Sequence, residues 1–104
     1  MATRPRPVVW SQSAQRELEE VLAHVAKDSP SGAQSIAHRT LEAAGSLSTL
    51  SERGRIVPEI NDPLVRETFV YAYRLLYRVA ETRITILAFI HGARDFERWR
   101  REEQ

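Results

Sequence analysis

Cysteine is absent from the 104-residue chain, which excludes disulfides, cysteine nucleophiles and thiolate metal sites. The three histidines, His24, His38 and His91, are not spaced as metal ligands are. No apolar run approaches the ~20 residues that span a bilayer, and no apolar segment of signal-peptide length follows the basic N-terminus. We therefore expect a cytoplasmic protein that contacts no membrane and holds neither a metal nor a cofactor.

Lysine is nearly absent too. Lys27 is the only lysine, against fourteen arginines. The rigid guanidinium fork matches phosphate and carboxylate geometry, although a GC-rich genome would produce the same bias. The net charge is only +1, but seven arginines face four acidic residues between positions 53 and 94. The basic character is therefore concentrated in the half of the chain where strands are expected.

Length and composition indicate one globular unit. Hydrophobic residues make up 42% and charged residues 28% of the chain, which is ordinary for a folded protein and argues against disorder. This length leaves no room for two domains. We expect residues 1–104 to form a single domain, with residues 1–7 flexible and residues 95–104 either a charged tail or a short helix.

Hydrophobic periodicity predicts two helices in the first half. Apolar residues recur every three or four positions from Ala14 to Ala26, with Ser11 or Ser13 as the N-cap. The Ser29–Gly32 segment breaks the pattern. A second amphipathic segment then runs from about Ala33 to Leu50. A break this short favours an antiparallel helical hairpin.

The sequence of the second half of the chain predicts an antiparallel meander of strands. Segments rich in β-branched and aromatic residues follow each other with only short turns between them, at Val65–Tyr71, Tyr73–Ala80 and Arg83–His91. A short strand is also expected at Val8–Trp10. The order β-α-α-β-β-β predicts an α+β fold, in which the helical hairpin packs on one face of a small, mainly antiparallel, twisted sheet.

The last two strands have a register that can be predicted. If Glu81-Thr82 is a two-residue turn, Leu76 faces Leu87 and Arg74 faces Phe89. Alternation then gives the helices a face that is apolar apart from tyrosine hydroxyls, made of Tyr73, Leu75, Tyr77, Val79, Ile84, Ile86, Ala88 and Ile90.

The opposite face of this hairpin would carry charge. Arg74 and Arg78 would lie there, with His91 at the strand end, beside apolar groups. Such an open face fits a phosphate-bearing partner. The pattern equally allows Arg74 and Arg78 to pair with Glu59 or Glu67 at the sheet edge.

Five short motifs follow one another in the second half: Gly54-Arg55-Ile56-Val57-Pro58-Glu59, Arg66-Glu67, Tyr73-Arg74-Leu75-Leu76-Tyr77-Arg78-Val79, Ile84-Thr85-Ile86-Leu87 and His91-Gly92-Ala93-Arg94. Their order and spacing, over roughly Val8 to Arg94, resemble the RelE/ParE superfamily of bacterial toxins. The resemblance implies the toxin component of a type II toxin–antitoxin system that arrests bacterial growth. It also implies a small cognate antitoxin that wraps and neutralises the toxin.

The superfamily includes two mechanisms. RelE-like members cut mRNA on the ribosome without a metal, and ParE-like members poison DNA gyrase and are not enzymes. Resemblance to the nuclease branches implies a general base at Glu59, a phosphate-clamping arginine at Arg74, a general acid at His91 and a second arginine at Arg94. Further candidates for RNA or target binding are Arg55, Arg66 and Arg78.

The sequence also departs from the nuclease pattern. Gly92 stands where the YoeB-like branch has a tyrosine. The C-terminal tyrosine of RelE-like members is missing, and Phe96 and Trp99 are the nearest aromatic residues. We expect a toxin that leans to ribosome-dependent mRNA cleavage, with the ribosome and mRNA as partners. The alternative is a gyrase inhibitor without enzymatic activity.

Overall fold

A mixed five-stranded sheet, in the order β1-β5-β4-β3-β2, forms the centre of the fold. The computed structural model describes residues 4–102. The elements in chain order are β1 (Val8–Trp10), α1 (Gln12–Ala26), α2 (Pro30–Ser46), β2 (Arg55–Ile56), β3 (Val65–Val70), β4 (Tyr73–Val79), β5 (Ile84–His91) and α3 (Gly92–Glu102).

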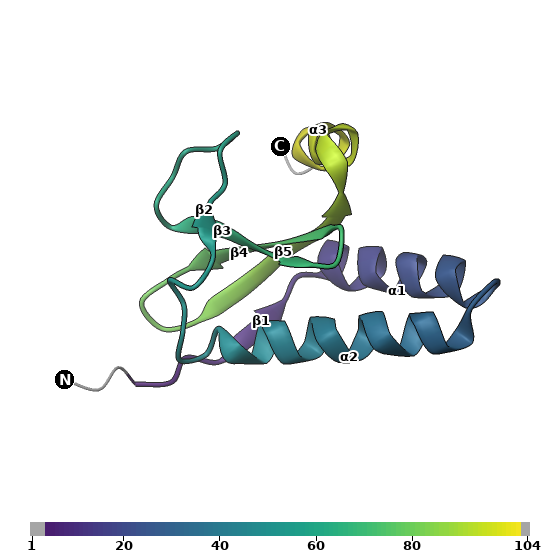
Figure 1. Ribbon diagram of the computed structural model, residues 1–104. Coiled ribbons are helices and arrows are strands. Elements are labelled where there is room, and N and C mark those ends of the chain that lie inside the picture. Colours follow the sequence, from purple (N-terminus) through teal and green to yellow (C-terminus); the bar gives the residue numbers. More distant parts are fainter. Residues whose placement is uncertain (1–3, 103–104) are drawn as a thin grey trace.

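Helices cover both faces of the sheet. The α1–α2 hairpin lies on one face, while α3 and the loop between β2 and β3 lie on the other (Figure 1). Only β1 and β5 pair in parallel. The predicted α+β class, helical hairpin and mainly antiparallel sheet are confirmed. Residues 53–59, which the sequence allowed to be a loop or a short strand, contain the two-residue strand β2. Of the two alternatives for the C-terminal segment, the helix is observed, as α3 up to Glu102.

The two hairpin helices start at serine caps. The Ser11 hydroxyl accepts a hydrogen bond from the Ala14 N–H, at 3.1 Å. The Ser29 hydroxyl accepts from the Gly32 N–H, at 3.0 Å. The predicted start of the second helix at Ala33 was wrong, because Pro30 occupies the first turn, where the missing N–H costs nothing.

Residues 1–7 were expected to be flexible. Residues 1–3 lie outside the described residues. Next to them, the Arg6 N–H donates to the Ser48 carbonyl, and the Pro7 carbonyl accepts from the Ile84 N–H, both at 2.9 Å. The chain is therefore hydrogen-bonded to the body of the fold from Arg6 onwards.

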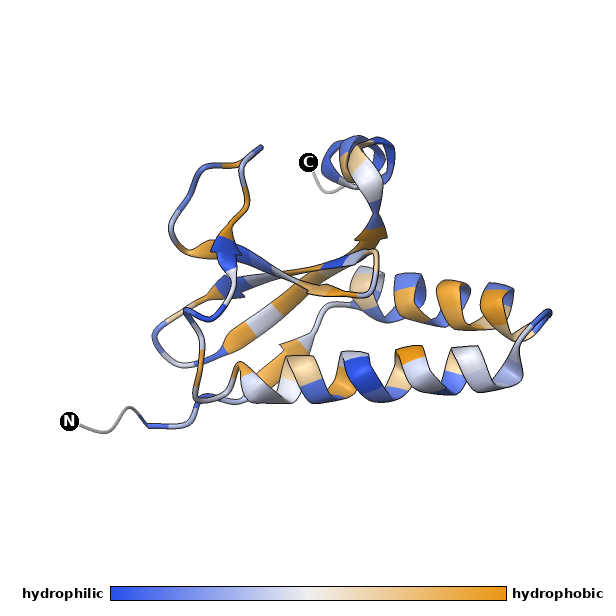
Figure 2. Cartoon of the chain, in the orientation of Figure 1, coloured by the Kyte–Doolittle hydropathy of each residue, from blue (hydrophilic) through white to orange (hydrophobic). Residues whose placement is uncertain are grey.

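The main core lies between the helical hairpin and the sheet. Its fully buried members include Leu47, Leu75, Tyr77, Ile84 and Ile86. Figure 2 shows much of the hydrophobic colour on α1 and β5, whereas α3 is mostly hydrophilic. The core predicted from periodicity is confirmed at these positions in the sheet.

The predicted register holds for only half of the β4–β5 hairpin. Val79 faces Ile84 and Arg78 faces Thr85, as a two-residue turn requires. Beyond the next pair the ladder shifts by one residue, so that Arg74 faces Ile90 instead of Phe89. The prediction was wrong there because a β-bulge adds one residue to β5. Beyond the bulge, the β5 side chains that face the α1–α2 hairpin are therefore the opposite set from the predicted one, whereas those of β4 are unchanged.

The bulge exchanges residues between the two faces. Phe89 joins the main core, and Ala88 and Ile90 turn to the other face. That face is not open as predicted, because Phe96 and Trp99 of α3 pack on it and complete a second, smaller core. Arg74 is consequently buried beneath α3, with only 7% of its surface exposed.

Candidate functional site

Arg74 is the centre of the candidate site. Its two terminal nitrogens, Nη1 and Nη2, donate to the two carboxylate oxygens of Glu59, at 2.8 and 2.7 Å. Its Nε donates to Glu67 Oε1 at 2.6 Å. The guanidinium carbon also lies 5.1 Å from the ring centre of Phe96 on α3. Each of the three guanidinium nitrogens therefore has a close acceptor.

Glu67 extends the arrangement across the sheet. Its side chain is fully buried on β3, and its second oxygen accepts a 2.7 Å hydrogen bond from Arg55 Nε on β2. We call Arg55, Glu59, Glu67 and Arg74 the carboxylate–arginine network. It contains two cations and two anions, so its charges balance. Balance of this kind is what allows charges to be buried, because an unpaired buried charge is strongly destabilising.

The bidentate ion pair favours the ionised forms of Glu59 and Arg74. Hydrogen bonding from Arg74 lowers the pKa of Glu59, against the opposing effect of burial. The hydrogen bonds to Glu59 raise the pKa of Arg74, and those to Glu67 act in the same direction. A general base works best when its pKa lies near the working pH. A lowered pKa makes Glu59 a poorer base.

His91 lies away from Arg74. It pairs with Tyr73 across β4 and β5, and the two rings meet edge-on with centres 5.3 Å apart. Tyr73 packs against the main core. Because neighbouring side chains on a strand point to opposite faces, Tyr73 and His91 lie on the face of the helical hairpin and Arg74 lies on the face of α3. The expected placement of His91 beside Arg74 was wrong, and the bulge is the reason.

The remaining predicted arginines have different environments. Arg94 is exposed on α3 and forms no ion pair within residues 4–102. Arg78 is half-exposed, 4.0 Å from Asp62. Arg66 donates to the carbonyls of Pro63 and Gly54, each at 3.0 Å. Of the seven predicted site residues, the structure joins Glu59 to Arg74 directly and Arg55 to Arg74 through Glu67.

Sequence reasoning undervalued two features of this site. Glu67 was considered only as a possible partner of an arginine, and Phe96 and Trp99 only as substitutes for a missing tyrosine. The three-residue spacing of these two aromatics in a charged segment was a signal for an amphipathic helix. The pairing of Arg74 with Glu59 and Glu67, one of the two arrangements that the sequence allowed, is confirmed. The second arginine on Glu67, Arg55, had no such signal, because β2 contains only two residues.

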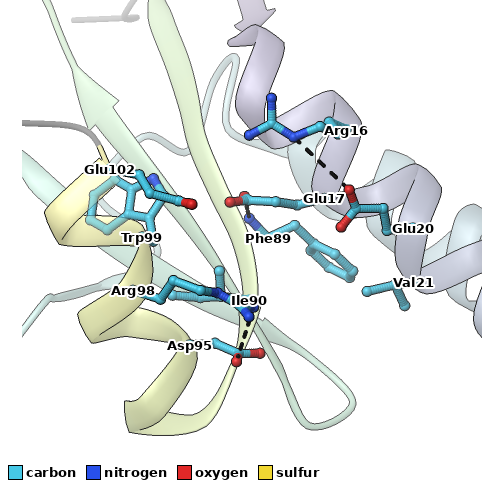
Figure 3. A pocket seen from close by; sticks show the side chains of 10 residues that line it. All are labelled: Arg16, Glu17, Glu20, Val21, Phe89, Ile90, Asp95, Arg98, Trp99 and Glu102. Carbon is cyan, nitrogen blue, oxygen red and sulfur yellow. Dashed lines mark hydrogen bonds and ion pairs between the residues drawn. The ribbon is translucent and has the colours of Figure 1, made fainter.

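A separate groove lies between α1 and α3 (Figure 3). It encloses about 310 Å³, and Arg16, Glu17, Phe89, Asp95, Arg98 and Trp99 are among its lining residues. Glu17 Oε1 accepts a 2.9 Å hydrogen bond from the Phe89 N–H. Pairing of β5 with β1 ends at Ile86, and the Glu17 carboxylate takes the place of a neighbouring strand as the acceptor for the Phe89 N–H. The groove is lined by none of the network residues.

No cluster of three or more potential metal ligands occurs within residues 4–102. None of the helices in that range is long and apolar enough to cross a bilayer.

Comparison with known proteins gives consistent matches. Residues 8–96 match the family described as ParE toxin of type II toxin-antitoxin system, parDE. Toxin RelE2 of Caulobacter vibrioides is 34% identical over 87 residues, which cover 84% of this chain and 96% of the relative.

Two solved structures are also similar to the fold. A chain of the chromosomal ParDE toxin–antitoxin system from P. aeruginosa superposes with a TM-score of 0.71 at 19% identity, covering 88% of this chain and all of the other. This match demonstrates a shared fold. A chain of the toxin–antitoxin complex RelBE2 from Mycobacterium tuberculosis has a TM-score of 0.55 at 25% identity, with 86% and 93% of the two chains covered.

Proposed function

Since the chain belongs to the ParE toxin family of type II toxin–antitoxin systems, we propose that it arrests growth by binding DNA gyrase as a folded, non-catalytic inhibitor. It is a toxin of the RelE/ParE superfamily with a cognate antitoxin as its partner. The target and the mechanism are the parts that we propose. Action on gyrase would take place in the cytoplasm.

The observation that carries this proposal is the bidentate ion pair between Glu59 and Arg74. Cleavage of RNA would need Glu59 to accept a proton from a ribose hydroxyl and Arg74 to stabilise the charge on the phosphate. Each of these groups already satisfies the other. In our proposal they hold the loop between β2 and β3 against α3, and so shape the surface that contacts the target.

The exposed residues provide the contacts in this proposal. His91 and Arg94 are both exposed at the junction of β5 and α3, and Arg78 is half-exposed on β4. Arginine is over-represented among residues that dominate protein interfaces. We assign these three side chains to target binding, whereas Arg55, Arg66 and Arg74 support the fold around them.

Ribosome-dependent mRNA cleavage is the second candidate. It is favoured by the 34% identity to a relative named RelE2. It requires the Glu59–Arg74 pair to open when an RNA phosphate approaches, and a proton donor other than His91 beside that phosphate. The binding mechanism needs neither the opening of this ion pair nor a further proton donor.

Induction in a bacterial host separates the two mechanisms. We expect intact transcripts when 5′ ends are mapped genome-wide, together with double-strand DNA breaks and filamentation. Purified toxin should inhibit supercoiling by purified gyrase and accumulate cleaved DNA. New transcript ends within coding regions, with supercoiling unaffected, would overturn the gyrase proposal and favour cleavage.

A further inference from the structure

Tyr71 adopts a backbone conformation that its side chain disfavours. It begins the two-residue turn between β3 and β4, because Val70 pairs with Tyr73. Its φ is 53°, in the left-handed region where glycine and asparagine are common and bulky residues are outliers. The tyrosine remains 57% exposed, so packing offsets little of this cost. The ring is presented to solvent at a position where glycine would suit the fold better.

The ring of Tyr71 forms one wall of a groove between α2 and the β3–β4 turn. We call it the hairpin groove; it encloses about 290 Å³ and is lined by Arg39, Ala43, Arg53, Thr68, Val70 and Tyr71, among others. The guanidinium of Arg39 lies 5.2 Å from the centre of the Tyr71 ring. The groove therefore combines an aromatic wall with cationic groups.

The cations of the hairpin groove are not neutralised. Within residues 4–102 neither Arg39 nor Arg53 forms an ion pair, and Arg53 Nη1 donates only to the Ser46 hydroxyl, at 3.0 Å. Glu42 also lines the groove, and its carboxylate lies 3.9 Å from the imidazole Nε2 of His38 rather than on either arginine. Two arginines and one carboxylate leave a positive excess, which complements an acidic occupant.

We propose that the hairpin groove binds an acidic segment of the cognate antitoxin. A carboxylate of that segment pairs with Arg39 and Arg53, and an adjacent apolar side chain packs against the exposed ring of Tyr71. Tyrosine and arginine are the residue types that most often dominate protein interfaces, especially where they surround a small desolvated pocket. The strained tyrosine is thus a binding residue, and its conformational cost is offset only in the complex.

A protein segment fits the groove better than a nucleic acid does. Binding of a nucleic-acid strand requires a continuous basic track along several phosphates. The chain has a net charge of only +1, and Glu42 interrupts the basic surface within the groove itself. The antitoxin is favoured over the toxin's target because the family's toxins are paired with an antitoxin. The proposal therefore does not depend on the gyrase mechanism.

The Tyr71→Gly substitution gives a sharp test, because it removes the aromatic ring and also relieves the backbone strain at this positive φ. We would purify the product of the neighbouring reading frame as the antitoxin and measure its Kd for the full-length toxin by calorimetry. We expect Tyr71→Gly to raise the Tm of the free toxin and to weaken antitoxin binding about 10- to 100-fold. Tyr71→Phe, which keeps the ring and the strain, should bind within about threefold of the wild type.

The contribution of the groove's positive charge to antitoxin binding is tested by substituting one arginine inside the groove and one outside it. Arg39→Ala should weaken binding by about tenfold at low salt and less at high salt, because it removes an exposed charge from the contact. Arg83→Ala, at the exposed turn between β4 and β5, is the control and should bind as the wild type does. Equal losses in both variants would overturn the proposal, because they would indicate a general effect of net charge.

Growth assays distinguish binding of the antitoxin in the hairpin groove from binding of the toxin's target there. Tyr71→Gly expressed alone should arrest growth as the wild type does, but should need more antitoxin for neutralisation. Unchanged antitoxin affinity in Tyr71→Gly would overturn the proposal. Loss of growth arrest with normal antitoxin affinity would also overturn it, because the groove would then contact the target. Tight, salt-sensitive binding of a single-stranded oligonucleotide that Tyr71→Gly abolishes would assign the groove to nucleic acid instead.

Discussion

Among the charged residues that the structure describes, Glu67 is the most deeply buried. Its carboxylate is fully buried and accepts hydrogen bonds from Arg74 and Arg55 on its two oxygens. Removing one partner of a buried ion pair leaves the other charge without compensation, and this costs more than the pair contributes when intact. The residue therefore determines whether Arg74 can be buried at all.

We expect Glu67→Ala to lower the free energy of unfolding by about 3–5 kcal/mol, because Arg74 loses a buried acceptor. Urea denaturation followed by circular dichroism measures this loss as a lower transition midpoint. Glu81→Ala, at the exposed turn after β4, is the matched control and should change the free energy by less than about 0.5 kcal/mol. A small effect at Glu67 would mean that the network adds little to the stability of the fold.

The pH dependence of stability should reveal the ion pair of Glu59. Its pKa in the folded protein is lowered by Arg74, so the unfolded chain takes up the proton first as the pH falls. The stabilisation is fully present above the ordinary pKa of a glutamate, about 4.3, and is lost as the pH falls through the lowered value. The difference in unfolding free energy between wild type and Glu59→Gln should therefore shrink below about pH 4.3. A difference that is constant from pH 3 to pH 7 would contradict this assignment.

At the scale of elements, α3 converts an exposed sheet face into a second core. Phe96 is fully buried against this face, and its ring also packs against the guanidinium of Arg74. The helix itself is mostly hydrophilic (Figure 2), so its attachment depends on a small number of apolar contacts. Loss of these contacts would expose the carboxylate–arginine network to water.

Truncating Phe96 should therefore have two effects. Phe96→Ala should cost about 3–5 kcal/mol of stability, as expected for a fully buried aromatic side chain. It should also speed amide hydrogen exchange in α3 more than in α1 and α2, because only the small core is weakened. Glu97→Ala, on the exposed side of the same helix, is the control. Uniform acceleration across all three helices would indicate that α3 and the main core unfold together.

At the scale of the molecule, the proposed binding mechanism makes a prediction about growth arrest. In a non-catalytic inhibitor, single alanine substitutions weaken binding, and a higher dose of toxin compensates for the loss. We expect Arg94→Ala to raise the inducer concentration needed for arrest and to retain arrest at full induction. For a nuclease, loss of a catalytic group lowers the rate by about 10²–10³-fold. Complete loss of arrest at all doses, with normal folding, would contradict the binding mechanism.

Most of the fold could be predicted from the sequence because local signals determine it. The Ser11 cap, helical periodicity and the Glu81-Thr82 turn depend on residues close together in the chain, and the structure confirms them. Gly54, the first residue of a motif, is required by a contact between distant segments instead. A Cβ at this position would clash with the Glu67 carbonyl oxygen, so only glycine allows the close approach of the two backbones.

The candidate site could be predicted only in part. The sequence by itself determined which residue types were available: Glu59, Arg74 and Arg94 within motifs, and His91 at the end of a strand. The tertiary structure decided which of them meet. One extra residue at the bulge moves His91 to the face opposite Arg74, and Glu67 with α3 closes the face that appeared open. The physical reason is that register and ion pairing depend on contacts between distant segments, whereas capping and periodicity are local.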